Sequence, residues 1–269
     1  MNEQPRATTQ SSQQQQVAFV LCGALAHEVL AIAKRHEWNV ALFGVAAKHH
    51  MQPVNIAPAV EERLRELIPQ FWRVVVVYGD CGSGGELDRV LEHYNVPRIA
   101  GPHCYEMYGG LTFEQLLAEQ PGTFFLTDFL VRAFNGTIWK GLGLDRYPEL
   151  QADYFANYTR LVYLSQEDDP HLATQAQAIA ERLGLPLEIR HTGYGLLETR
   201  LVELMAEIDQ ARYQPKERHD GKLSDPVLVR HSASGARAGR GRASQRSAAR
   251  TLSGSRRRSR DGDETDRLG

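Results

Sequence analysis

The sequence predicts an α/β protein in which a mostly parallel sheet lies between two layers of helices, a three-layer α/β/α fold of the Rossmann-like type. Three observations support this prediction. Short apolar runs alternate with segments of helical periodicity through residues 17–213. Most of these runs are apolar at every position, as in strands that are buried on both faces of a parallel sheet. The composition, 42% hydrophobic and 24% charged over 269 residues, is ordinary for a globular chain and excludes collagen-like and wholly disordered classes.

Each short apolar run predicts one strand, and the strongest is RVVVVY at Arg73–Tyr78. The expected strands are Val17–Leu21, Asn39–Val45, Arg73–Tyr78, Val96–Ala100, Thr123–Leu126, Arg160–Leu164 and Leu187–Arg190. Apolar residues at three- and four-residue spacing predict helices between them. The expected helices are Glu28–Arg35, Ala59–Ile68, Glu86–Tyr94, Phe113–Ala118, Phe129–Phe134, Glu149–Tyr158, His171–Leu183 and Leu196–Gln210. Right-handed crossovers would bring the carboxyl ends of all strands to one edge, where open α/β sheets bind ligands.

Charge divides the chain into an acidic body and a basic tail. The net charge is −2, but residues 216–269 alone have a net charge of +7 and the remainder −9. We expect a disordered Gln- and Ser-rich leader over residues 1–16, a single α/β domain over 17–213, and a disordered Arg-, Ser- and Gly-rich tail over 214–269. The leader lacks the apolar core of a signal peptide, and no apolar run could span a bilayer. We therefore expect a cytoplasmic protein that does not bind membranes.

The basic tail contains two Arg-rich runs, Ala236–Ser247 and Ser255–Arg260, that could contact the phosphates of RNA or DNA. It has no interleaved aromatic residue for base stacking, and acidic residues near its end reduce its charge. We therefore expect no nucleic-acid partner. Deleting residues 216–269 should cause only a minor loss of function.

All three cysteines of the chain follow the carboxyl ends of expected strands. Cys22 comes directly after VAFVL, Cys81 follows RVVVVY, and Cys104 follows VPRIA. An odd number of cysteines does not make a disulfide framework, so we expect reduced thiols. Neighbouring strands lie about 5 Å apart. If the sheet is parallel, the three thiols should therefore gather in one small pocket.

Three interpretations of these thiols stay open. In the first, Cys22, Cys81 and Cys104 ligate one metal centre, either Zn²⁺ with an open position or a [4Fe–4S] cluster with one free iron. In the second, Cys81 is a nucleophile in its Gly-rich turn and His103 is its base. In the third, the thiols are buried and inert. No pair has C-x-x-C spacing, so the metal hypothesis depends on topology alone.

Polar residues beside the thiols are candidates for proton transfer. The expected catalytic residues are Asp80, His103, Tyr105 and Glu106. The turn GSGGE could cradle a ligand at a helix start, because glycine backbone can approach a ligand closely. Its candidate cofactor-binding residues are Gly82, Ser83 and Gly84. The turn matches neither of the common nucleotide-binding glycine patterns, and its acidic neighbours disfavour a polyphosphate.

Three motifs, LCGALAHEV, VVVYGDCGSGGELD and GPHCYEMYGG, occur in this order in the chain. Together they resemble an uncharacterised family, the domain-of-unknown-function 1638 proteins, over about residues 17–213. Members of that family are often encoded near corrinoid-dependent methyltransferases for methylated amines. The resemblance thus implies a context in one-carbon metabolism, with a corrinoid protein or a methyltransferase as a candidate partner. It supplies no catalytic residues.

These observations predict a metal-dependent protein that acts on a small molecule, either as an enzyme or as an enzyme-like accessory protein. The metal would act as a Lewis acid at its open position, or would hold and activate a substrate. A non-catalytic carrier of a metal or corrinoid is the first alternative. An enzyme with a cysteine nucleophile is the second.

Overall fold

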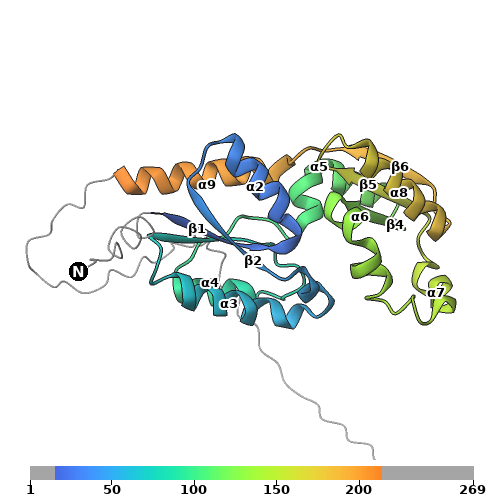
Figure 1. The fold of residues 1–269 in the computed structure, drawn as a ribbon, viewed down its shortest axis with the longest axis horizontal. Helices are drawn as coiled ribbons and strands as arrows, with labels where there is room; N and C mark the ends of the chain where they lie inside the picture. The colour runs from blue at the N-terminus through green and yellow to red at the C-terminus, as the bar shows by residue number, and fades with distance from the viewer. Residues whose placement is uncertain (1–15, 214–269) are drawn as a thin grey trace, which may run out of the picture. The chain divides into compact units, whose positions relative to one another are not determined.

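The structure is a computed structural model and describes residues 16–213 (Figure 1). It confirms the α/β class: the strands of each sheet pair in parallel, and helices cover the sheets. The strands form two three-stranded sheets rather than one, with the orders β2-β1-β3 and β4-β5-β6. We call these the first sheet and the second sheet. The predicted leader, apart from Gln16, and the predicted tail lie outside the described residues.

The observed strands agree with six of the seven expected runs. They are β1 (Val17–Cys22), β2 (Val40–Val45), β3 (Arg73–Val77), β4 (Thr123–Thr127), β5 (Arg160–Ser165) and β6 (Leu187–His191). The α-helices are α2 (Ala26–Arg35), α3 (Ile56–Leu67), α4 (Glu86–Tyr94), α5 (Cys104–Glu119), α6 (Asp128–Phe134), α7 (Gln151–Phe155), α8 (Pro170–Leu183) and α9 (Gly195–Tyr213). Short helical segments are η1 (Gly23–Leu25), η2 (Ala47–Met51), η3 (Pro53–Asn55), η4 (Asn135–Trp139) and η5 (Pro148–Leu150). No helix among the described residues is long and apolar enough to cross a membrane.

The first sheet is the middle layer of an α/β/α sandwich. In Figure 1, α2 and α9 lie on one face of this sheet, and α3 and α4 lie on the other. All six residues of β1 are buried, because β1 is the central strand and helices cover both of its faces. This burial explains why the run is apolar at every position.

The second sheet has its own core. On one face, Leu126 and Tyr163 pack with α6 and α8 in one apolar cluster. On the other face, Phe125 and Val162 pack against Phe113 of α5 in a second cluster. The second sheet is therefore also covered by helices on both faces.

Two local expectations differ from the structure. The segment Val96–Ala100 is not a strand and makes a single bridge, between Val76 and Arg98. Proline at position 97 cannot donate a hydrogen bond, which limits how far this segment can extend the sheet. The expected helix Phe113–Ala118 is the second half of α5, whose first half begins at Cys104.

Candidate functional site

The end of the central strand brings the first thiol beside a buried tyrosine. β1 and β3 pair in parallel through Leu21 and Val77, so the next residues of the two strands, Cys22 and Tyr78, follow at the same level. The Sγ atom of Cys22 accepts a hydrogen bond from the backbone N–H of Ala24 at 3.4 Å. Cys22 is thus buried at the carboxyl edge of the first sheet.

The other two thiols lie on loops whose backbones touch. A Cβ atom at Gly79 would lie 2.7 Å from the carbonyl oxygen of Pro102 and 2.9 Å from the Cα atom of His103, so a side chain does not fit there. The backbone N–H of Cys81 donates to the same Pro102 oxygen at 2.8 Å. Cys104 follows as the first residue of α5. The two loops therefore hold Cys81 and Cys104 near each other.

Cys81 has a strained backbone. Its φ of +48° is in the left-handed region, which non-glycine residues rarely adopt. Such strain is frequent at functional sites, where the surrounding structure holds a residue in an unusual orientation. Here the neighbouring Gly82, with φ of +86°, continues the same tight turn.

The three thiols are electrostatically coupled. Burial is the main cause that raises the pKa of each thiol, in Cys81 to about 12. Repulsion between thiolate charges raises these pKa values further. A charge on Cys22 raises the pKa of Cys81, and charges on Cys81 and Cys22 raise the pKa of Cys104. The thiols are therefore protonated at neutral pH.

Tyr78 completes the thiol cluster. It is fully buried, and its hydroxyl has no hydrogen-bond partner. Burial is the main cause that raises the pKa of this hydroxyl well above its ordinary value. The nearby Cys22 is the next cause, and Cys81 and Cys104 contribute less. The ring of His50 stacks on Tyr78 with a centroid distance of 5.7 Å. We call Cys22, Tyr78, Cys81 and Cys104 the thiol–tyrosine centre.

The Gly-rich turn is filled by its own aspartate. The carboxylate of Asp80 accepts hydrogen bonds from the Ser83 hydroxyl at 2.7 Å and from the backbone N–H groups of Gly85 at 3.0 Å and Gly82 at 3.2 Å. These bonds, first that from Ser83, lower the pKa of Asp80. The donors expected to cradle a cofactor at Gly82, Ser83 and Gly84 are thus largely used to fix the turn, and Gly84 contributes a positive φ of +65°.

The other expected catalytic residues also have structural partners. The Nδ1 atom of His103 accepts from the backbone N–H of Glu106 at 3.3 Å and caps α5. Burial lowers the pKa of His103, so its imidazole is neutral at pH 7. The Tyr105 hydroxyl donates to the carbonyl oxygen of Phe125 at 3.2 Å. Glu106 forms a two-pronged ion pair with Arg200 at 2.6 and 2.7 Å.

The geometry does not supply a finished metal site. Among residues 16–213, no three His, Cys, Asp or Glu side chains are placed to hold a metal ion together. The donor chemistry of the three thiols suits Zn²⁺ or iron, but their positions in this structure do not. Metal ligation by Cys22, Cys81 and Cys104 would require the thiols to move closer.

Two buried polar groups near the thiols stand out in the structure: Glu28, which the sequence places beside the thiols, and Tyr108, which sequence reasoning missed. Glu28, at the start of α2, has an exposed fraction of 1%, and neither carboxylate oxygen has a hydrogen-bond partner. Tyr108, in the first half of α5, has an exposed fraction of 3% and an unpartnered hydroxyl. Both belong to the motifs that include Cys22 and Cys104, but only burial, which depends on packing, distinguishes them from ordinary helix residues.

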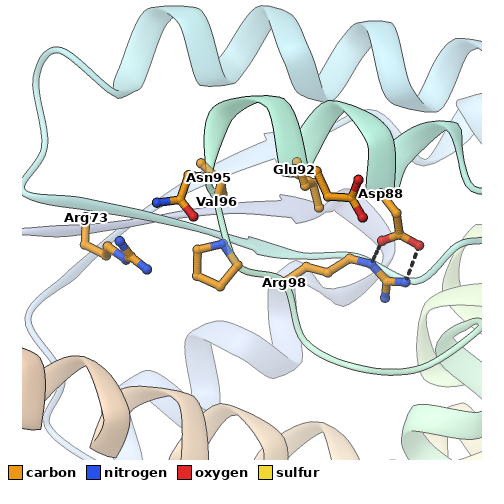
Figure 2. A pocket seen from close by; sticks show the side chains of 8 residues that line it. Arg73, Asp88, Glu92, Asn95, Val96 and Arg98 are labelled. Atoms are coloured by element: carbon orange, nitrogen blue, oxygen red, sulfur yellow. Dashed lines mark hydrogen bonds and ion pairs between the residues drawn. The ribbon is translucent and has the colours of Figure 1, made fainter. Parts of the chain in front are cut away.

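An open cavity of about 410 Å³ lies beside β3 and α4, and its lining includes none of the three thiols (Figure 2). Its most conspicuous charge is Arg98, which Figure 2 shows turned toward Asp88. The two side chains form bonds of 2.5 and 3.0 Å, and Arg98 also donates to the carbonyl oxygen of Ile99. The arginine is thus already paired, and the cavity lies apart from the three thiols.

Comparison with known proteins gives one positive result. No curated protein matches the chain. Residues 45–201 match the family described as "Protein of unknown function (DUF1638)", and the matched segment includes Tyr78, Cys81, Cys104 and Tyr108. Because this match spans more than half of the chain, the protein belongs to the DUF1638 family.

Proposed function

We propose that this protein binds a small molecule at the carboxyl edge of its first sheet, where the thiol–tyrosine centre would contact it. One observation carries the proposal: three thiols and a buried hydroxyl without a partner converge from β1, β3 and α5. A buried polar atom that makes no hydrogen bond is costly, and such atoms at the ligand-binding edge of an α/β sheet favour a site that a ligand completes.

The residues of the centre suit proton transfer and soft-atom contacts. Protonated thiols and the Tyr78 hydroxyl can each donate one hydrogen bond in a region of low dielectric constant. His103 accepts a hydrogen bond at Nδ1, so its proton is assigned to Nε2, from which it could be given to a ligand. An enzyme and a carrier would share this chemistry, and turnover of the ligand distinguishes them.

A second candidate function is metal-dependent, with Zn²⁺ or a [4Fe–4S] cluster on Cys22, Cys81 and Cys104. The electrostatic coupling of all three thiols favours it, and metal uptake would require these side chains to change their positions, since they do not form a metal-binding group among the described residues. A place in corrinoid-linked methyl transfer, with a corrinoid protein or a methyltransferase as partner, is a further proposal drawn from the family resemblance.

Native mass spectrometry of protein purified without air tests the first proposal. We expect a bound mass in the wild type that is absent from Tyr78→Phe, while Tyr94→Phe, on the distal helix α4, keeps it. Removal of one buried hydroxyl keeps the shape of the ring, so folding should be retained. An identical bound mass in all three proteins would contradict the proposed site.

Elemental analysis of the same anaerobic samples tests the metal. The metal proposal predicts close to one equivalent of zinc, or iron with a broad absorption band near ~400 nm, and its loss in Cys81→Ser. Less than about a tenth of an equivalent of either metal would contradict it.

A further inference from the structure

Glu28 is the most unusual polar group among the described residues. A carboxylate with an exposed fraction of 1% and no hydrogen bond costs folding free energy, and carboxylates are rarely fully buried unless they are paired. Nη1 of Arg132 lies 3.8 Å from Oε1 of Glu28, which is beyond hydrogen-bond distance. Glu28 therefore has an unused capacity to accept hydrogen bonds.

Arg132 is shared among three carboxylates and satisfies none of them fully. Its Nη2 atom lies 3.7 Å from Asp128 and 3.5 Å from Glu167, and its Nη1 atom faces Glu28. With one arginine and three carboxylates, the cluster has a negative balance. His27 lies 3.5 Å from Glu167 but its side chain is 59% exposed. An additional cation would thus be favoured beside Glu28.

Tyr108 supplies a second unpartnered group at the same place. Burial raises the pKa of the Tyr108 hydroxyl, and the Glu28 carboxylate raises it further through its charge and through a weak hydrogen-bond contact with the hydroxyl, which places the two side chains close together. Neither group has another partner among the described residues. The lone pairs of Glu28 and of the Tyr108 oxygen can both accept from N–H groups.

Glycines with positive φ lie at both passages of the chain between the two sheets. The chain passes from the first sheet to the second through α5 and returns between β6 and α9. Gly110 interrupts α5 with φ of +49° and ψ of −131°. Gly195 starts α9 with φ of +51°, and a Cβ atom there would collide with the carbonyl oxygen of Tyr108. The two passages therefore touch beside Tyr108, the arrangement expected of a hinge.

We propose that Glu28, Tyr108 and Glu167 bind the cationic N–H group of a small organic ligand, such as a primary ammonium, and that bending at Gly110 and Gly195 admits it. The carboxylates would accept hydrogen bonds from the N–H groups of the ligand. The positive charge of the ligand would balance the carboxylates at closer range than the guanidinium of Arg132 does. The inference rests on the proposed function in one respect, since it names the class of ligand that binds at the same edge of the first sheet.

Calorimetric titration with n-butylammonium, with 1-butanol and butyrate as uncharged and anionic probes, tests this proposal on the full chain. We expect binding of the ammonium alone and at least about tenfold weaker binding by Glu28→Gln. Glu62→Gln, which changes an exposed residue of α3, should bind like the wild type. Arg132→Gln removes the internal competitor and should bind the ammonium several-fold more tightly.

Three results would overturn the proposal. The first is no ammonium binding by the wild type, and the second is equal affinity in the wild type and Glu28→Gln. Tighter binding of butyrate than of butylammonium would also overturn it, because Arg132 would then be the recognising group. These outcomes are independent of the mass bound at Tyr78. A bound mass that Tyr78→Phe loses, with no butylammonium binding by the wild type, would support the thiol–tyrosine centre and contradict the cation site. A bound mass that Tyr78→Phe keeps, with butylammonium binding that Glu28→Gln weakens, would support the cation site and contradict the centre.

Discussion

Replacement of Glu28 by methionine should stabilise the protein, although most substitutions of buried residues destabilise it. Methionine has a similar length and no polar atom. The substitution removes two buried oxygens that make no hydrogen bond. Each buried unsatisfied polar group costs about 1–3 kcal/mol, and the attraction to Arg132 across 3.8 Å offsets part of that cost. We expect the free energy of unfolding to rise by about 1–3 kcal/mol.

The gain should depend on pH with a definite sign. Burial raises the pKa of Glu28 above its ordinary value of 4.5. The folded state therefore holds the proton more tightly than the unfolded state, so the contribution of Glu28 to stability is fully present below pH 4.5 and is lost as the pH rises through the folded pKa. The advantage of Glu28→Met over the wild type should accordingly be larger at pH 7.5 than at pH 4.5.

Urea denaturation of both proteins at these two pH values measures the effect. Val29→Ala, which shortens a fully buried neighbour in α2, is the matched control and should lose about 1–3 kcal/mol at both pH values. A loss of stability by Glu28→Met at pH 7.5 would refute the reasoning, because Glu28 would then make a stabilising bond in the folded protein. An equal gain at both pH values would show that its charge is not the destabilising factor.

Three further substitutions test the packing and the polar contacts around the two sheets. Gly195→Ala should cost at least about 2 kcal/mol more than Gly184→Ala in urea denaturation, because both positions have positive φ but only the first has a backbone atom in the way. Tyr163→Phe removes the 2.6 Å hydrogen bond to the buried carboxylate of Asp128 and should cost about 1–2 kcal/mol, whereas no change would show that the bond is dispensable. Arg98→Ala should lower the melting temperature by a few degrees in low salt and by less in high salt, and a salt-independent loss would indicate packing rather than charge.

The sequence predicted the bounds of a helix or strand well where residues within and next to that element determine them. The helix Glu86–Tyr94 has the bounds that its periodicity predicts, since glycine at position 85 and Asn95, both with positive φ, delimit it. The three apolar runs of the first sheet became its three strands for the same reason. The division into two sheets was not predictable, because the central strands β1 and β5 of the two sheets show the same buried apolar pattern, and pairing partners are set by tertiary packing.

The topology of the sheet predicted where the thiols would lie. It did not predict which polar groups of the site are buried or which of them are hydrogen-bonded. The parallel strands β1 and β3 place Cys22 and Cys81 after strand ends at one edge, whereas Cys104 follows a segment that is not a strand and begins α5. Asp80 closes its own turn through bonds to near neighbours, but these bonds depend on the backbone conformation of the Gly-rich turn, which the sequence does not fix. Arg200, on α9, holds Glu106 from a position far along the chain, so the sequence could not reveal this pair. For the same reason the lack of partners for Glu28 and Tyr108 appears only in three dimensions.

The central claim is that thiols far apart in the sequence share one small site at the edge of the first sheet. Phenylarsine oxide tests it directly, because trivalent arsenic bridges thiols only when two of them are close together. Mass spectrometry of the folded protein should find one arsenic per chain with the loss of at least two free thiols, and Cys81→Ser should take up markedly less. Three thiols that each react with a simple alkylating agent, with no uptake of arsenic by the folded wild type, would contradict the account.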